Sequence, residues 1–163
     1  MPKLLVLFDA RSDELTRLAE AVAEGARRVR FAEVDVRRLD GASGATGRHR
    51  ALESGDAIAA YDGIIVGADS AVAHDEEALD PLASAPSLLN KVGAAFVAAR
   101  PAENGRNALW SALAPLADRG MILVTPPVTD ASGDALESAL ELGKRVADVV
   151  GWVTHARSHH HHH

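Results

Sequence analysis

The chain contains no cysteine, few aromatic residues and no long apolar run. Without cysteine there can be no disulfide bond, no thiolate metal ligand and no cysteine nucleophile, so redox chemistry would need a bound cofactor. Aromatic residues make up 4% of the chain, and no pair of them is placed so that it must sandwich a flat ring. We therefore expect the aromatic side chains in the core, at Phe8, Phe31, Phe96 and Trp110, with Trp152 in a C-terminal tail or at a helix end.

Basic residues are in the minority, with 17 Lys and Arg against 23 Asp and Glu and a formal net charge of -6. This balance opposes binding to the nucleic-acid backbone or to anionic lipid, and no Lys/Arg cluster offsets it. The first apolar run, residues 4–8, is too short for the core of a signal peptide or for a membrane span. The composition predicts a cytoplasmic protein with neither nucleic acid nor membrane as a partner.

The chain has 163 residues, of which 47% are hydrophobic, and this is enough to bury a substantial core. We interpret residues 1–157 as one domain and residues 158–163, which include His159 to His163, as an expression tag. The tag histidines are excluded from any reasoning about metals.

Apolar runs bounded by turn residues predict five strands, at residues 4–8, 29–36, 63–67, 94–98 and 121–125. The run at 29–36 alternates and suits an edge strand, whereas the others are almost continuously apolar, as in strands covered on both faces. Helical spacing occurs at residues 15–26, 50–61, 75–89, 107–118 and 134–150, while 40–54 has the composition of a mobile loop. This alternation predicts an α/β three-layer sandwich with a five-stranded parallel sheet in the order 2-1-3-4-5.

Ligands of such a sheet bind beyond the carboxyl ends of its strands, which here are followed by the loops 9–14, 68–75 and 99–106. The segments LVLF (5–8), AEAVAEGA (19–26), YDGIIVG (61–67) and LADRGMILV (116–124) resemble those of the flavodoxin-like NAD(P)H:quinone oxidoreductases of the tryptophan-repressor-binding type. The resemblance implies a flavodoxin-like fold, FMN held in the three loops, electron transfer from NAD(P)H to quinones, and a homo-oligomer, most simply a dimer.

On this resemblance the candidate cofactor-binding residues come from all three loops. They are Ala10, Arg11, Ser12, Asp13, Glu14 and Leu15 in the first, Ala68, Asp69, Ser70 and Ala71 in the second, and Ala99, Arg100 and Pro101 in the third. No catalytic residue can be assigned.

Each loop departs from the pattern of the family it resembles. In the first loop, Ala10, Asp13 and Arg17 stand where the family has serine, glycine and threonine. Ser12 can cap the following helix, and the carboxylates of Asp13 and Glu14 can then satisfy the positive end of that helix in place of a phosphate. The second loop lacks the family's proline, arginine, aromatic and glycine residues, and in the third Pro101 has no N–H to donate.

Two functional hypotheses follow. The first is a flavodoxin-like protein that has lost tight FMN binding and serves as a non-catalytic binding or assembly module, for example for a small anionic ligand held by Arg11, Arg100 and Arg106. The alternative is a divergent FMN-dependent NAD(P)H:quinone oxidoreductase or electron-transfer flavoprotein, in which backbone amides of the loops hold the cofactor. The altered loops favour the first hypothesis and the resemblance favours the second.

Three other functions have less support from the sequence. The acidic stretch 74–77 is typical of a solvated helix N-terminus, so we expect no metal. A response-regulator receiver needs an acceptor Asp after the third strand and a Lys before a Pro after the fifth, where this chain has Gly67-Ala68 and Thr125-Pro126. A serine hydrolase would need a Gly-x-Ser-x-Gly elbow, which is absent, and we interpret His49 and His155 as surface residues.

Overall fold

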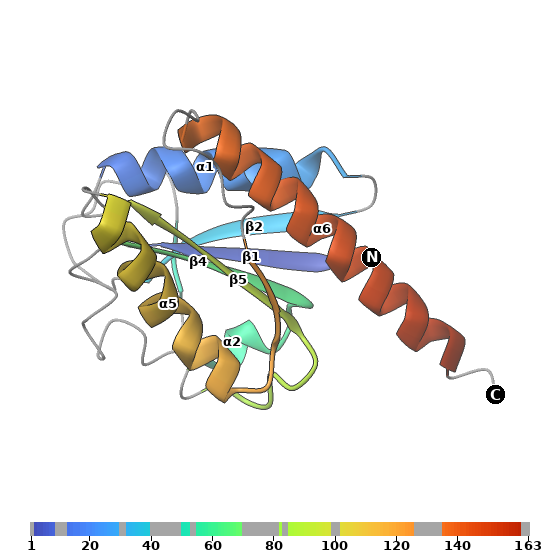
Figure 1. Cartoon of the computed structure of the whole chain (residues 1–163). Coiled ribbons are helices and arrows are strands. Elements are labelled where there is room, and N and C mark those ends of the chain that lie inside the picture. Colours follow the sequence, from blue (N-terminus) through green and yellow to red (C-terminus); the bar gives the residue numbers. More distant parts are fainter. Residues whose placement is uncertain are drawn as a thin grey trace.

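The computed structural model describes residues 2–8, 13–29, 32–39, 50–52, 55–69, 82, 85–98, 102–125 and 135–160. These residues form a parallel β-sheet between two layers of helices (Figure 1). Within these segments every helix is too short or too polar to cross a membrane.

The sheet contains the five strands that the sequence predicts, in the predicted order 2-1-3-4-5. In the numbering of Figure 1 they are β2 (Glu33–Arg38), β1 (Lys3–Phe8), β4 (Gly63–Asp69), β5 (Val92–Ala98) and β6 (Ile122–Val124). Every pair of neighbours is parallel. The flavodoxin-like α/β topology expected from the alternation of strands and helices is therefore confirmed.

A sixth strand, β3 (Arg50–Ala51), was not predicted. It pairs in parallel with the last two residues of β2, Arg37 and Arg38, so β2 is covered over part of its length. The predicted helix over 50–61 is wrong in its first half, because the chain forms this strand before the short helix α2 (Gly55–Ile58). The loop expected over 40–54 is also wrong at Arg50–Ala51, and its residues 40–49 and 53–54 lie outside the described residues.

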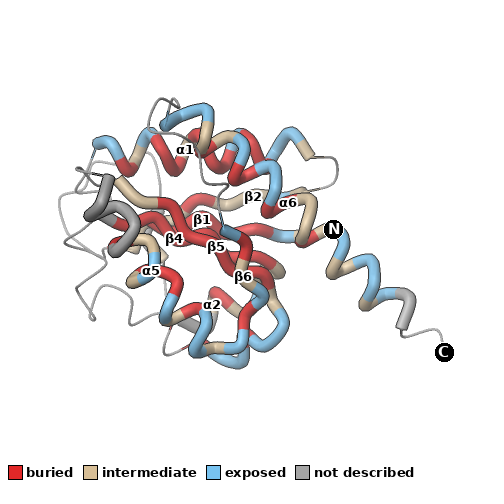
Figure 2. The backbone as a smooth tube through the Cα atoms, in the orientation of Figure 1, coloured by how far each residue is buried: buried red, intermediate tan, exposed pale blue. Residues whose placement is uncertain are grey.

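Helices cover both faces of the sheet, and β1 accordingly presents buried side chains alternately to the two faces. Leu4, Val6 and Phe8 pack in one core with the helices α1 (Asp13–Arg27) and α6 (Ala135–His160). Leu5 and Leu7 pack in a second core with α2 and with α5 (Ala102–Asp118). Figure 2 shows the buried residues concentrated along the sheet and on the helix surfaces that face it.

The helices α1 and α6 lie in unusually close contact. A β-carbon added to Gly25 of α1 would collide with the carbonyl oxygen of Leu140, and one added to Gly143 of α6 would collide with the carbonyl oxygen of Val22. Each helix thus places a glycine where the backbone of the other passes. This contact fixes the relative position of the two helices and of the two N-termini from which they start.

Some predicted boundaries and burial states need correction. Trp110 was expected in the core, but its side chain is 61% exposed, because α5 turns Ala108, Ala112 and Leu116 toward the sheet and Trp110 away from it. Phe8 and Phe96 are buried as expected, and Trp152, 69% exposed, lies in the last part of α6.

The predicted element boundaries also shift. The strand expected at 29–36 begins at Glu33, and α6 continues past the expected end at residue 150 to His160, two residues into the histidine run. Of the helix expected at 75–89, Leu82 is helical as predicted, whereas residues 85–89 are not helical. Most of that segment and Phe31 lie outside the described residues.

Candidate functional site

The carboxyl ends of β1, β4 and β5 lie at one edge of the sheet. The chain leaves β1 toward β2 on one side, whereas β4 and β5 follow on the other side, so the strand order reverses between β1 and β4. Crevices at such reversal points are where open α/β sheets bind ligands. The last residues of these strands are Phe8, Asp69 and Ala98, and Asp69 pairs with Ala98.

The structure describes five of the thirteen candidate residues. Asp13 and Glu14 are exposed in the first turn of α1, whereas the side chains of Leu15 and Ala68 are fully buried in the two cores. A ligand could therefore reach Leu15 and Ala68 through their backbone only. Asp69 is the last residue of β4. The other eight, Ala10, Arg11, Ser12, Ser70, Ala71, Ala99, Arg100 and Pro101, lie outside the described residues, and their predicted role stays a prediction.

The first turn of α1 carries negative charge at the end of the helix where a phosphate would bind. The positive end of a helix dipole attracts anions, and a phosphate at that place would use the N–H groups of the first turn. In this chain the first turn carries the carboxylates of Asp13 and Glu14. Two acidic residues in this turn add negative charge near the N–H groups that a phosphate would use, and this charge opposes the approach of a dianion.

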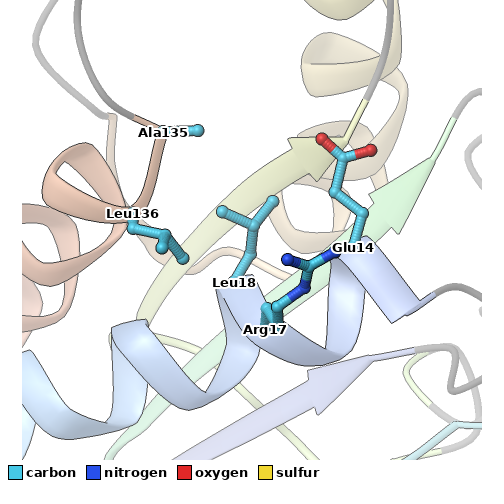
Figure 3. A pocket seen from close by; sticks show the side chains of 5 residues that line it. All are labelled: Glu14, Arg17, Leu18, Ala135 and Leu136. Carbon is cyan, nitrogen blue, oxygen red and sulfur yellow. The ribbon is translucent and has the colours of Figure 1, made fainter.

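A pocket of about 430 Å³ lies between the starts of α1 and α6. Glu14, Arg17 and Leu18 line it from α1, and Ala135 and Leu136 from the first turn of α6. Figure 3 shows the Glu14 and Arg17 side chains extending from the same stretch of α1, with Leu18 turned toward Leu136. The described part of the lining thus combines one carboxylate, one guanidinium and an apolar wall.

Only Glu14 of these five lining residues belongs to the candidate site predicted from the sequence. The signal that could have found the others is topological. Both α1 and α6 follow strands whose carboxyl ends share one edge of the sheet, so the N-termini of the two helices must lie near each other. Arg17 also stands out as a cation one turn beyond the acidic residues, on the same side of the helix as Glu14.

The two described groups with clearly shifted pKa values lie at the opposite edge of the sheet. Tyr61 lies two residues before the start of β4, and Lys91 lies immediately before β5. Burial raises the pKa of Tyr61 to about 12 with help from a hydrogen bond to Asp35, and burial lowers the pKa of Lys91. Neither group is placed to act on a ligand in the pocket or at the strand carboxyl ends.

The structure also bears on the alternatives to a flavodoxin-like site. Strand β4 extends two residues beyond its predicted end, so that it ends in an acid, Asp69, as a receiver domain requires. However, Thr125 follows β6 where a receiver would have its lysine. His155 is exposed on α6, as expected for a surface residue, whereas His49 and the acidic stretch 74–77 lie outside the described residues.

Comparison with solved structures identifies the architecture. The fold is that of the flavodoxins. A flavodoxin-type WrbA-like protein from Agrobacterium tumefaciens superposes with a TM-score of 0.65 and 24% identity, covering 93% of this chain and 99% of the other. A flavodoxin from the Archaea gives a TM-score of 0.64 and 19% identity, with 91% and 99% covered. An NAD(P)H:quinone oxidoreductase from Methanothermobacter marburgensis gives 0.51 and 10%, with 90% and 97% covered.

No protein-family model matches the sequence. The resemblance predicted from the four sequence segments is therefore confirmed for the flavodoxin-like fold, and at these low identities the similarity shows the fold alone. The function must be argued from the site.

Proposed function

We propose that this flavodoxin-like protein does not bind FMN tightly and acts as a non-catalytic binding or assembly module. The observation that carries the proposal is the pair of carboxylates, Asp13 and Glu14, in the first turn of α1. Each stabilises its own helix N-terminus by about 0.3–1 kcal/mol. If a phosphate displaced these carboxylates, the helix would lose this stabilisation. If the phosphate bound beside them, their negative charge would repel it.

The test is a calorimetric titration of the protein with FMN and with riboflavin, which lacks the phosphate. We expect the unmodified protein to bind FMN no more tightly than riboflavin, because the acidic first turn gives the phosphate no favourable contact. An FMN dissociation constant of about 1 μM or below, about -8 kcal/mol, together with weaker riboflavin binding, would contradict the proposal.

A reversal variant tests the electrostatic argument directly. The triple change Ala10→Ser, Asp13→Gly and Glu14→Thr removes both carboxylates and adds two hydroxyls, so FMN affinity should rise by about tenfold or more relative to riboflavin. Glu24→Thr is the matched control, because Glu24 lies in α1 but near its C-terminal end, where it pairs with Arg28. It should leave the ratio of the two affinities unchanged.

The second candidate function is a divergent FMN-dependent NAD(P)H:quinone oxidoreductase or electron-transfer flavoprotein. Its support is the reversal of strand order between β1 and β4, which forms a ligand-binding edge of the kind at which flavodoxin-like folds hold cofactors. Under this hypothesis the phosphate would depend on Arg11 and on backbone N–H groups. The FMN-preferring result in the titration above would favour it.

We further propose that the protein is cytoplasmic, which its composition supports. We also propose that it forms a dimer, which the sequence resemblance supports. The net charge of -6 supports partners other than nucleic acid or anionic membrane. Sedimentation equilibrium of the purified chain tests the dimer.

A further inference from the structure

We propose that the pocket between α1 and α6 binds a small zwitterion with an apolar body, of the chemical type of a branched-chain α-amino acid. The inference rests on the proposed function, because it names the ligand class that the binding module would take. In this proposal the cation that binds the ligand is Arg17, in place of Arg11, Arg100 and Arg106, which the sequence suggested.

The pocket has the size and the lining of a small-molecule site. Its volume of about 430 Å³ lies within the range of about 300–1,000 Å³ typical of ligand pockets. Among the lining residues that the structure describes, Leu18, Ala135 and Leu136 are apolar, and Glu14 and Arg17 carry one charge of each sign. Such a lining matches a ligand that is apolar in its body, charged at one end and neutral overall.

The two charged side chains are positioned by the helix itself. Glu14 and Arg17 are three residues apart on α1, so they project from the same side of it. Both line the pocket, and Figure 3 shows their side chains extending from the same stretch of the helix. The Arg17 guanidinium can bind a carboxylate through two parallel N–H donors. The Glu14 carboxylate can accept hydrogen bonds from an ammonium group.

The N-terminus of α6 also favours a ligand orientation in which the carboxylate lies at Arg17. Ala135 and Leu136 belong to the first turn of α6, whose dipole places partial positive charge at the pocket. This charge adds to that of Arg17 and attracts the ligand carboxylate. Leu18 and Leu136, from the two helices, contact the apolar body, and Glu14 repels a ligand that carries only negative charge.

The contact between α1 and α6 sets how far apart the two helices lie beside the pocket. The close contact at Gly25 of α1 and Gly143 of α6 lies further along both helices. The pocket lies at their N-terminal ends, beyond this contact. The spacing of the two helices that line the pocket therefore depends on this contact.

The experiment is a calorimetric titration of the whole chain with L-leucine, isoamylamine and isocaproate. The last two keep the apolar body of leucine and carry only its positive or only its negative charge. We expect leucine to bind with a dissociation constant of about 1 mM or below, and each single-charge analogue to bind about tenfold more weakly or worse. Equal binding of isocaproate, or no leucine binding, would overturn the proposal.

Variants assign the binding to the pocket. Arg17→Gln should weaken leucine binding about tenfold and leave isoamylamine unaffected, whereas Glu14→Gln should weaken leucine and leave isocaproate unaffected. Arg28→Gln is the matched control, because Arg28 lies just beyond the other end of α1 and pairs with Glu24. If Arg28→Gln weakens binding as much as Arg17→Gln does, the site lies elsewhere and the proposal is wrong.

The FMN titration separates failure of this inference from failure of the proposed function. Weak FMN binding without leucine binding would overturn the ligand class and leave the proposed function intact. Tight, phosphate-dependent FMN binding would overturn the proposed function, and leucine binding would then still decide whether the α1/α6 pocket is a separate site.

Discussion

Tyr61 is the one tyrosine of the chain, and its hydroxyl group is held by the fold. It donates a hydrogen bond of 2.6 Å to the carboxylate of Asp35 in the middle of β2. Burial raises the pKa of Tyr61 to about 12, and the hydrogen bond and negative charge of Asp35 contribute further. The bond ties the segment before β4 to a strand on the far side of β1.

Because no other tyrosine is present, the tyrosinate absorbance of the folded protein reports this group alone. We expect a titration midpoint near pH 12 for the native protein and a lower one for Asp35→Asn, which removes the charge and weakens the hydrogen bond. Glu33→Gln is the matched control, because Glu33 lies on the same strand but pairs with Lys3. This variant should leave the titration midpoint of Tyr61 unchanged. A midpoint near the ordinary value of about 10 in the native protein would contradict the contact.

The same group gives a pH dependence of stability. The pKa of Tyr61 is raised in the folded state, so between about pH 10 and pH 12 the unfolded chain loses its phenolic proton while the folded chain keeps it. The stabilisation from Tyr61 is complete below pH 10 and is lost as the pH rises toward 12. Denaturant unfolding of the native protein and of Tyr61→Phe should show a stability difference that shrinks across this interval and is constant below it.

The packing of α1 against α6 depends on two glycines, and α6 offers a matched pair for testing it. A β-carbon at Gly143 would meet the backbone of Val22, whereas one at Gly151 would meet nothing within 4 Å. Gly143→Ala should lower the free energy of unfolding by about 1–3 kcal/mol, as overpacking does when the obstacle is backbone. Gly151→Ala should raise it by up to about 1 kcal/mol, because alanine favours the helix.

Urea denaturation of the two variants measures both effects with the same substitution in the same helix. Equal stabilities would mean that α1 and α6 can separate at no cost, and the close contact would then be wrong. A destabilised Gly143→Ala variant that also loses leucine binding would show that the width of the pocket depends on this contact.

The helical periodicity of the sequence predicts which segments are helices, but it does not predict how closely two helices pack against each other. The amphipathic segment 15–26 predicts α1 with nearly its observed bounds. Gly25 and Gly143 carry no signal of close contact in a single sequence, since each is an ordinary interruption of a helical pattern. Trp110 was assigned to the core from its residue type, whereas its position on α5 relative to Ala108 and Ala112 places it outside.

Across the whole molecule, the sheet was predictable and the site only in part. Continuous apolar strands alternating with helices leave few topologies, which is why the order 2-1-3-4-5 could be derived. The strand β3 could not, because its two residues show no apolar pattern. The acidic first turn of α1 is visible in the sequence, but the pocket is made by residues from distant segments, and Arg17 and Leu136 meet only in the folded chain.

The sheet should unfold from its edges toward its centre. All side chains of β1 from Leu4 to Phe8 are fully buried, as are those of Ile64 to Val66 in β4, whereas Ile122 of the three-residue edge strand β6 is 39% exposed. Slow amide exchange follows burial and contact density. We therefore expect the amides of β1 and β4 to exchange only through global unfolding, and that of Ile122 to exchange through local opening.

Hydrogen exchange followed by nuclear magnetic resonance measures this difference at increasing denaturant. The Ile122 amide is a fair comparison, because it donates a hydrogen bond of 2.8 Å to the carbonyl of Lys91 and so is protected by bonding as well. Its exchange should be faster than that of Leu5 and independent of low denaturant concentrations. If both amides exchange at the same rate, β6 unfolds together with the centre of the sheet, and its short pairing with β5 is more strongly held than its exposure implies.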